Sequence, residues 1–249
     1  MKSLLRAVMP RTIRPRRILA GPLRGAWLVT SWHDYPAGLS GRTERRLLDW
    51  FAASVRPGET WIDVGAYYGY TALALARIVG PTGRVVAFEP VTATAGCLDQ
   101  GLAINRLTQV TVLPFGLGAA ETLETRRLVV TRGMADATLP PDSSRPLVDI
   151  PVVRFDWIWP LLRRSAGPLH GIKIDVQGME VEVLEGMTET LSRWRPKLVV
   201  ELHPGVSRTR VMAVLQACGY SHDAVAIESP SGETAPRFLD DRSYVFHPA

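Results

Sequence analysis

Residues 60–79 read TWIDVGAYYGYTALALARIV. Residues 60–64 predict a short strand, and Gly65 and Gly69 mark the loop that follows it. Apolar residues at positions 72, 75, 76 and 79 then recur at the spacing of one helix face. A strand, a glycine loop and a helix in this order predict a βαβ unit, and with it an α/β fold built on a parallel sheet.

The same alternation continues through most of the chain. Further strands are expected at 84–88, 110–113, 170–175, 198–202 and 243–247, and further helices at 42–55, 93–105, 181–194 and 208–217. This pattern predicts a doubly wound, mainly parallel sheet with helices on both faces, whose ligands bind beyond the carboxyl ends of the strands. Two more strands, at 125–131 and 149–154, enclose a polar segment at 132–147 that is either a lid or disordered.

The composition indicates one well-buried domain in a chain of 249 residues, 46% of them hydrophobic. No apolar run approaches the roughly 18 residues that a membrane span needs. Cys97 and Cys218 are far apart in the sequence, so they predict neither a disulfide framework nor a zinc site, and they suit a reducing compartment. We therefore expect a cytoplasmic protein.

The positive charge is concentrated at the N-terminus. The first 24 residues hold no acid, while the rest of the chain has 22 basic and 24 acidic residues; the basic residues of this segment are Lys2, Arg6, Arg11, Arg14, Arg16, Arg17 and Arg24. We expect residues 1–40 to be a basic arm with an irregular or helical extension, and 41–249 to be the main domain. The arm is either a solvated leader or a contact for an anionic membrane surface or a phosphorylated substrate. A signal peptide is not expected, because Pro10 and Pro15 interrupt its apolar core.

The glycine loop and two acidic residues indicate a cofactor. Gly65 and Gly69 have GxxxG spacing, not the GxGxxG of a dinucleotide site, and Asp63 precedes them. A pyrophosphate has no use for this acid, whereas the ammonium group of an amino-acid cofactor does. Glu89 ends the second strand, 24 residues after Gly65, where an acid that accepts both ribose hydroxyls is expected. These residues favour S-adenosyl-L-methionine and leave NAD(H) as the weaker alternative.

The chain resembles the FkbM-type methyltransferase family. The matching motifs are DVGA at 63–66 with Gly69, VAFEP at 86–90, residues 102–105, VRFD at 153–156, KIDVQGME at 173–180, VLEG at 183–186 and residues 196–201. They cover about residues 60–202, and KIDVQGME is the most specific of them. The resemblance implies a Rossmann-like methyltransferase fold with a seven-stranded sheet, S-adenosyl-L-methionine as cofactor, and O-methylation of a hydroxyl on a sugar, glycolipid or secondary metabolite.

Three positions depart from the pattern of that family. Tyr67 stands where Asn is usual, Gln177 where Glu is usual, and PFGL at 114–117 where an Asn-x-Ala-like turn is favoured. The last departure leaves the adenine contact to the backbone of Gly116 or Leu117, and Gln177 weakens any case for a metal. The residues expected to bind the cofactor are Asp63, Gly65, Ala66, Tyr67, Gly69, Tyr70, Glu89, Pro90, Gly116 and Leu117.

Methyl transfer to an alcohol needs an acceptor oxygen held in line and a group that takes its proton. Asp175 ends the fourth strand of the expected parallel set, and Glu201 with His203 ends the fifth. We expect Asp175 to be the base or the acceptor-hydroxyl binder, with Glu180, Glu201 and His203 as partners. Lys173 lies on the same strand face and either takes part in the reaction or orients Asp175. Asp175, Glu201 and His203 also suit a divalent metal, but a hydrogen-bonded cluster without metal is favoured.

The sequence says less about the acceptor. Four residues near the arm, Trp27, Trp32, His33 and Tyr35, either line a sugar or lipid pocket or pack on the core. Trp157 and Trp159 are expected in the core.

Two other functions stay open beside transfer to a small molecule, glycan or lipid. A nucleic-acid methyltransferase would use the basic arm, but the sequence has no Asn/Asp-Pro-Pro-aromatic loop and no Pro-Cys nucleophile, so nucleic acid is not favoured as partner. A catalytically silent cofactor-binding or scaffold protein would explain the unusual Tyr67 and Gln177.

Overall fold

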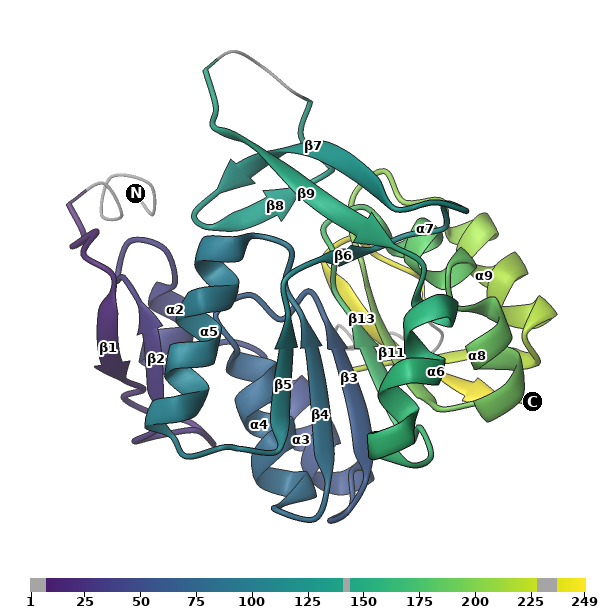
Figure 1. Ribbon diagram of the computed structural model, residues 1–249, viewed down its shortest axis with the longest axis horizontal. Helices are drawn as coiled ribbons and strands as arrows, with labels where there is room; N and C mark the ends of the chain where they lie inside the picture. The colour runs from purple at the N-terminus through teal and green to yellow at the C-terminus, as the bar shows by residue number, and fades with distance from the viewer. Residues whose placement is uncertain (1–7, 141–143, 228–236) are drawn as a thin grey trace.

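The computed structural model describes residues 8–140, 144–227 and 237–249, and its centre is a seven-stranded sheet (Figure 1). The strands follow the order β12-β13-β11-β10-β3-β4-β5. Their bounds are Thr60–Val64 (β3), Arg84–Phe88 (β4), Val110–Leu113 (β5), Gly171–Ile174 (β10), Lys197–Leu202 (β11), Tyr220–Ala226 (β12) and Arg242–Pro248 (β13). β13 runs antiparallel to both neighbours, and the other pairs are parallel. The expected α/β class with a mainly parallel sheet is confirmed, although β12 was not anticipated.

Helices cover both faces of this sheet, because its strands bury side chains on both sides. On one face, α3 (Arg45–Ser54), α4 (Tyr70–Val79) and α5 (Thr92–Ile104) share a core with Trp61 and Val85. On the other, α6 (Phe155–Ala166), α7 (Glu180–Glu185), α8 (Thr188–Trp194) and α9 (Arg208–Ala217) share a core with Ile62 and Val86. Successive residues of one strand therefore belong to two cores, as in a doubly wound sheet.

The helix expected at 181–194 is two helices, so the prediction of a continuous one was wrong. α7 ends at Glu185 and α8 begins at Thr188. The carboxylate of Asp156, in α6, accepts hydrogen bonds from the backbone N–H groups of Glu189 and Thr190, at 3.0 and 2.9 Å. It satisfies the first turn of α8 as an N-cap residue would. Because this cap comes from another helix, the apolar spacing of the segment does not reveal it.

The N-terminal segment differs from the expected irregular arm. β1 (Arg14–Arg17) and β2 (Trp27–Thr30) form an antiparallel pair, and a short α2 (Pro36–Ser40) follows. β2 packs on α5, where the side-chain amide of Asn105 accepts from the N–H of Trp27 at 3.0 Å and donates to its carbonyl at 2.7 Å. Residues 14–40 are therefore part of the folded body. Lys2 and Arg6 lie outside the described residues.

A second sheet, of four strands, lies across the carboxyl ends of the main sheet (Figure 1). Its order is β6-β9-β7-β8, with bounds Gly116–Leu117 (β6), Glu124–Thr131 (β7), Met134–Asp136 (β8) and Leu147–Val153 (β9). β7 and β9 match the strands expected at 125–131 and 149–154. The segment at 132–147, expected to be a lid or disordered, contributes β8 to this sheet; its residues 141–143 lie outside the described part.

α6 places its two tryptophans differently. Trp159 is buried as expected, but Trp157 is 41% exposed, so its expected place in the core was wrong. Phe155 and Trp159 stand one turn apart and face the sheet, which turns Trp157 outward. Among the described residues, no helix is both long and apolar enough to cross a membrane.

Candidate active site

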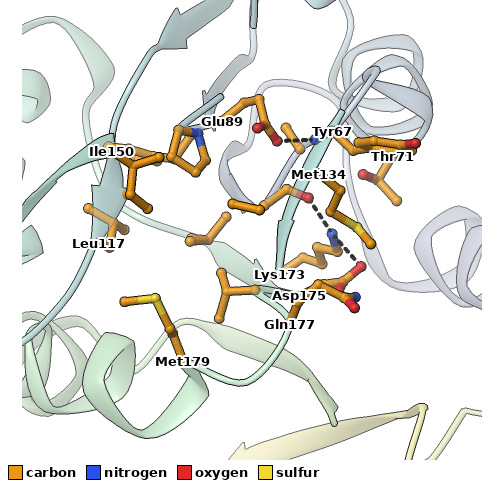
Figure 2. A pocket seen from close by; sticks show the side chains of 18 of the residues that line it. Tyr67, Thr71, Glu89, Leu117, Met134, Ile150, Lys173, Asp175, Gln177 and Met179 are labelled. Carbon is orange, nitrogen blue, oxygen red and sulfur yellow. Dashed lines mark hydrogen bonds and ion pairs between the residues drawn. The ribbon is translucent and has the colours of Figure 1, made fainter. Parts of the chain in front are cut away.

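A cavity that is partly open to solvent lies at the carboxyl ends of β3, β4 and β10 (Figure 2). In Figure 2 the apolar side chains of Leu117, Ile150 and Met179 lie on one side of it, and Lys173 and Asp175 lie on the other, together with the side chain of Met134. The cavity therefore has an apolar end and a polar end. This is the position at which a doubly wound sheet is expected to bind its ligand.

Gly65 shapes the floor of the cavity. Its φ of +77° lies in the left-handed region, and a Cβ atom added there would come within 1.8 Å of the carbonyl oxygen of Asp175. Only glycine fits this position without moving the backbone at the end of β10. The N–H groups of Gly65 and Ala66 both donate to the carbonyl of Phe88 at 3.0 Å, which ties the loop to β4.

Glu89 follows β4 and lines the cavity. Its carboxylate accepts hydrogen bonds from the N–H groups of Tyr67 at 2.8 Å and Val91 at 2.9 Å. Burial raises the pKa of Glu89 to about 7, although these two hydrogen bonds act in the opposite direction. The two hydrogen bonds fix this carboxylate in the wall of the cavity, where its oxygens can accept further hydrogen bonds from a ligand.

The turn between β7 and β8 covers the glycine loop. The hydroxyl of Tyr67 donates to the carbonyl of Arg132 at 2.7 Å, and that of Thr94 donates to the carbonyl of Gly133 at 2.5 Å. Beyond β8, the N–H of Ala137 donates to the carbonyl of Gln177 at 3.0 Å. These bonds hold the second sheet over the cavity from both of its ends.

Lys173 is the buried cation at the polar end. Its ammonium lies 3.3 Å from Asp63 Oδ1 and 3.4 Å from Asp175 Oδ2, and it donates to the carbonyl of Gly65 at 3.3 Å. Burial alone lowers the pKa of Lys173, but the two carboxylates outweigh it and hold this pKa above its usual value. Lys173 therefore stays charged and fixes the position of Asp175 against the glycine loop.

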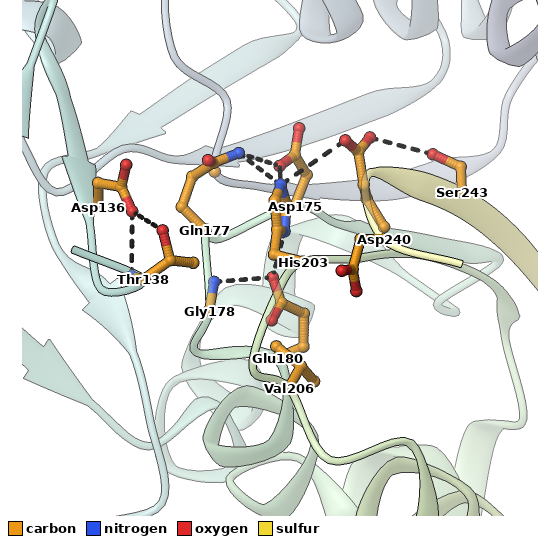
Figure 3. Close-up of polar contacts among 12 residues, drawn as sticks. Asp136, Thr138, Asp175, Gln177, Gly178, Glu180, His203, Val206, Asp240 and Ser243 are labelled. Carbon is orange, nitrogen blue, oxygen red and sulfur yellow. Dashed lines mark hydrogen bonds and ion pairs between the residues drawn. The ribbon is translucent and has the colours of Figure 1, made fainter. Parts of the chain in front are cut away.

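His203 lies behind Asp175, between Gln177 and Glu180 (Figure 3). Its Nδ1 is 2.8 Å from Glu180 Oε1, while its Nε2 is 2.6 Å from Gln177 Nε2 and 3.5 Å from Asp175 Oδ1. Burial alone lowers the pKa of His203, but the Glu180 hydrogen bond and the Asp175 charge outweigh burial and raise this pKa to about 9. Burial would raise the pKa of Asp175, but Lys173 and His203 outweigh it and keep this pKa below its usual value.

Glu201 completes the polar cluster. Its Oε1 lies 3.6 Å from His203 Nε2, and its Oε2 accepts a hydrogen bond from Ser243 at 3.2 Å. Burial and the charge of Asp175 raise the pKa of Glu201 to about 8. One ligand atom from each of Asp175, Glu201 and His203 can be chosen within 4.8 Å of the others, so a cation could sit among them. Such a cation would have to displace the proton of His203. Because the pKa of His203 is raised, this displacement opposes metal binding at neutral pH.

The cavity collects most of the residues that the sequence predicts for the cofactor. Those that line it are Gly65, Ala66, Tyr67, Tyr70, Glu89, Pro90, Gly116 and Leu117. Asp63 does not line it, because its fully buried carboxylate lies between Lys173 and the Thr71 hydroxyl, which donates at 2.6 Å. Gly69 is instead the N-cap residue of α4, where a Cβ would meet Leu98 at 2.2 Å. Lys173 and Asp175 line the cavity; Glu180, Glu201 and His203 reach it only through Asp175 and Gln177.

Several lining residues were not singled out in the sequence, namely Glu44, Thr71, Leu128, Met134, Ile150 and Met179. Leu128, Met134 and Ile150 belong to the second sheet, whose long-range strand pairing no local pattern reveals. Thr71 carried a signal, because it is in the first turn of the helix after the glycine loop. Of the four residues near the arm, Tyr35 lines the cavity and Trp27, Trp32 and His33 do not.

The fold and the site together define a class of protein. A mainly parallel seven-stranded sheet with antiparallel β13, and a cavity over its carboxyl ends with Gly65 and Glu89, are those of the Rossmann-like methyltransferase fold. A family model described as "Methyltransferase FkbM domain" matches residues 63–221. The chain therefore belongs to the FkbM methyltransferase family, as the sequence resemblance implied.

The chain is similar to several solved structures at low sequence identity. An FkbM methyltransferase from Methylobacillus flagellatus has 19% identity and a TM-score of 0.51, with 80% of this chain and 50% of that chain covered. The chain thus spans half the length of that protein. The O-methyltransferase TomG from Streptomyces achromogenes, solved with S-adenosylmethionine, has 16% identity and a TM-score of 0.48, with 86% and 79% covered. Aeropyrum pernix fibrillarin, also solved with that cofactor, has 15% identity and a TM-score of 0.49, with 94% and 82% covered. A comparison with curated protein sequences finds no match.

Proposed function

We propose that the protein transfers the methyl group of S-adenosylmethionine to a hydroxyl of a sugar, glycolipid or secondary metabolite. The observation that carries the proposal is an ionised carboxylate, Asp175, at the polar end of the cofactor cavity. A hydroxyl acceptor must lose a proton during transfer, and a carboxylate within reach of the reacting oxygen can take it. Lys173 and His203 keep Asp175 charged and in place for this role.

The chain's own residues divide the work of such a reaction. Asp175 accepts a hydrogen bond from the acceptor hydroxyl and takes its proton as the oxygen forms its bond to the methyl carbon. S-adenosylmethionine supplies that carbon on a positively charged sulfur, which keeps the electron pair of the broken S–C bond. Lys173 and Gln177 hold the carboxylate, and the second sheet limits access of water. Positioning of this kind contributes about 7–11 kcal/mol in favourable cases.

Asp175→Asn tests the proposal. We expect methyl transfer to fall about 10²- to 10⁴-fold, because the amide cannot take the proton, while S-adenosylhomocysteine still binds. The measurement follows radiolabelled methyl groups from the cofactor into a panel of sugars, glycolipids and hydroxylated small molecules. Asp49→Asn, an exposed acid on α3, is the matched control and should keep full activity. Label found only in added RNA, or none in any acceptor, would contradict the proposal.

The N-terminal segment supports a second part of the proposal, contact with an anionic membrane surface. Arg14 and Arg17 are exposed on β1, and the guanidinium of Arg17 lies 4.8 Å from the centre of the Trp27 ring. Ile13 and Leu19, in the same segment, are 48% and 58% exposed. Basic and aliphatic side chains side by side suit a lipid headgroup region, which is both charged and partly apolar.

Vesicle binding tests this contact. Vesicles of phosphatidylcholine with phosphatidylglycerol should bind the protein, and pure phosphatidylcholine vesicles should not. Each basic residue near such a surface contributes about 1 kcal/mol, so Arg14→Ser with Arg17→Ser should weaken binding by about tenfold or more. Ile13→Ser with Leu19→Ser should also weaken it. Equal binding to both kinds of vesicle, or binding to neither, would contradict this contact.

A further inference from the structure

The two ends of the cavity suit the two ends of the cofactor. The apolar end, with Leu117, Ile150 and Met179, can enclose a purine, and Glu89 between the ends can accept the ribose hydroxyls (Figure 2). The amino-acid end of the cofactor carries an ammonium and a carboxylate, so it belongs at the polar end. The question is which side chains there recognise these two charged groups.

Two acids at the polar end already have cationic partners. Asp63 is fully buried, does not line the cavity, and contacts Lys173 and Thr71. Asp175 lines the cavity, but Lys173 lies 3.4 Å from one of its oxygens and His203 lies 3.5 Å from the other. Its charge is therefore largely compensated before any ligand binds.

Glu44 is a third acid on this wall; its Oε1 accepts a hydrogen bond from the Thr43 hydroxyl at 3.4 Å, and its charge is among those that raise the pKa of Lys173. It lines the cavity and directly precedes α3, and its φ of 52° and ψ of 24° place a non-glycine residue in the left-handed region. Such strained backbone is retained where the surrounding structure needs a side chain in one particular place. Burial raises the pKa of Tyr70, and the charge of Glu44 raises it further, which is consistent with their proximity.

Tyr70 provides an independent observation. It is 2% exposed and lines the same cavity, yet its hydroxyl has no hydrogen-bond partner within the described part of the chain. A buried hydroxyl without a partner destabilises a protein, so natural structures usually supply one. A ligand with an acceptor group at this place would satisfy it.

We propose that Glu44 and Tyr70 together recognise the amino-acid end of the cofactor. The carboxylate of Glu44 accepts hydrogen bonds from the ammonium group, and the hydroxyl of Tyr70 donates one to the cofactor carboxylate. This assignment replaces Asp63, which the sequence had favoured for the ammonium. It rests on S-adenosylmethionine as cofactor and is independent of the identity of the acceptor.

Calorimetric titration of the full-length protein tests the assignment without turnover. The probes are S-adenosylhomocysteine, its deaminated and decarboxylated analogues, and 5′-methylthioadenosine, which lacks both charged groups. Glu44→Gln should weaken S-adenosylhomocysteine about 10- to 100-fold and leave the deaminated analogue unchanged. Tyr70→Phe should weaken S-adenosylhomocysteine about tenfold and leave the decarboxylated analogue unchanged. Neither change should alter the affinity for 5′-methylthioadenosine.

Two controls keep the test decisive. Asp49→Asn removes an acid from α3, the helix that Glu44 directly precedes. This variant should bind all four probes as the unchanged protein does. Asp175→Asn should also keep its affinity for S-adenosylhomocysteine. If Asp175→Asn and not Glu44→Gln loses the ammonium-dependent part of binding, Glu44 is not the partner. Equal losses for all four probes would mean a general distortion of the cavity, and they would overturn the assignment too.

Discussion

Glu89 is the residue whose ionisation should control cofactor binding. Its pKa of about 7, raised by burial from the usual 4.5, means that it takes up a proton as the pH falls below neutral. The ribose hydroxyls donate to a carboxylate, so the protonated side chain loses acceptor capacity. The ligand therefore selects the deprotonated form, and affinity should fall as the pH falls through 7 and stay level above it.

We expect the affinity for S-adenosylhomocysteine to fall by up to about tenfold for each pH unit below 7, as a single protonation requires. Titrations between pH 5.5 and 8.5 measure it. Glu89→Gln should bind weakly at every pH and show a much flatter profile. A steep profile that persists in Glu89→Gln would assign the titration to another group.

The residues of the site were predictable to different degrees. Gly65 and Glu89 stand in local motifs, a glycine loop and a strand end, so their places follow from short stretches of sequence. The contacts of Asp63 cannot be predicted in this way, because they depend on strand register. Lys173 on β10 lies directly opposite Asp63 on β3. That pairing turns an acid expected to meet the cofactor into the partner of a buried lysine.

At the scale of elements, hydrogen bonds should hold the turn between β7 and β8 over the glycine loop. Tyr67→Phe removes its hydrogen bond to the carbonyl of Arg132. A net loss of about 0.5–1.5 kcal/mol should raise amide hydrogen exchange in Met134–Asp136 (β8) by about 2- to 10-fold. Tyr220→Phe, which removes a remote buried hydroxyl bonded to the carbonyl of Pro196, should leave β8 unchanged. Unaltered exchange in Tyr67→Phe would mean that other contacts hold the turn.

The main βαβ elements were predictable because their signals are local. β3, β4, β5 and α9 match the expected ranges, and Ser207 caps α9 by accepting a hydrogen bond from the N–H of Arg210 at 3.3 Å. The break between α7 and α8 was not predictable, because the Asp156 side chain that caps α8 belongs to another helix, α6. β8 and β6 are too short to show a period, and they exist through pairing with longer strands.

At the scale of the whole molecule, the N-terminal segment and the second sheet both contribute residues to the lining of the cavity. Tyr35, the residue directly before α2, lines the cavity, and its ring lies 4.9 Å from that of Tyr67 in an edge-on arrangement. The charge pattern identifies the segment before residue 24 as basic but carries no information on its packing. The expected boundary at residue 41 therefore separates parts that share one core.

A fragment of residues 41–249 should consequently fail to fold. Removing residues 1–40 strips four buried aliphatic side chains from the core that α3 and α5 share, namely Ile18, Leu23, Leu28 and Leu39. Each contributes about 1.5–3 kcal/mol when fully buried, so their sum rivals the roughly 5–15 kcal/mol that stabilises a whole domain. Circular dichroism during heating should show no cooperative transition for the fragment. The single change Leu28→Ala in the full chain should cost about 2–5 kcal/mol and keep a cooperative transition at lower temperature. A fragment that melts cooperatively would show that residues 41–249 fold without the N-terminal segment.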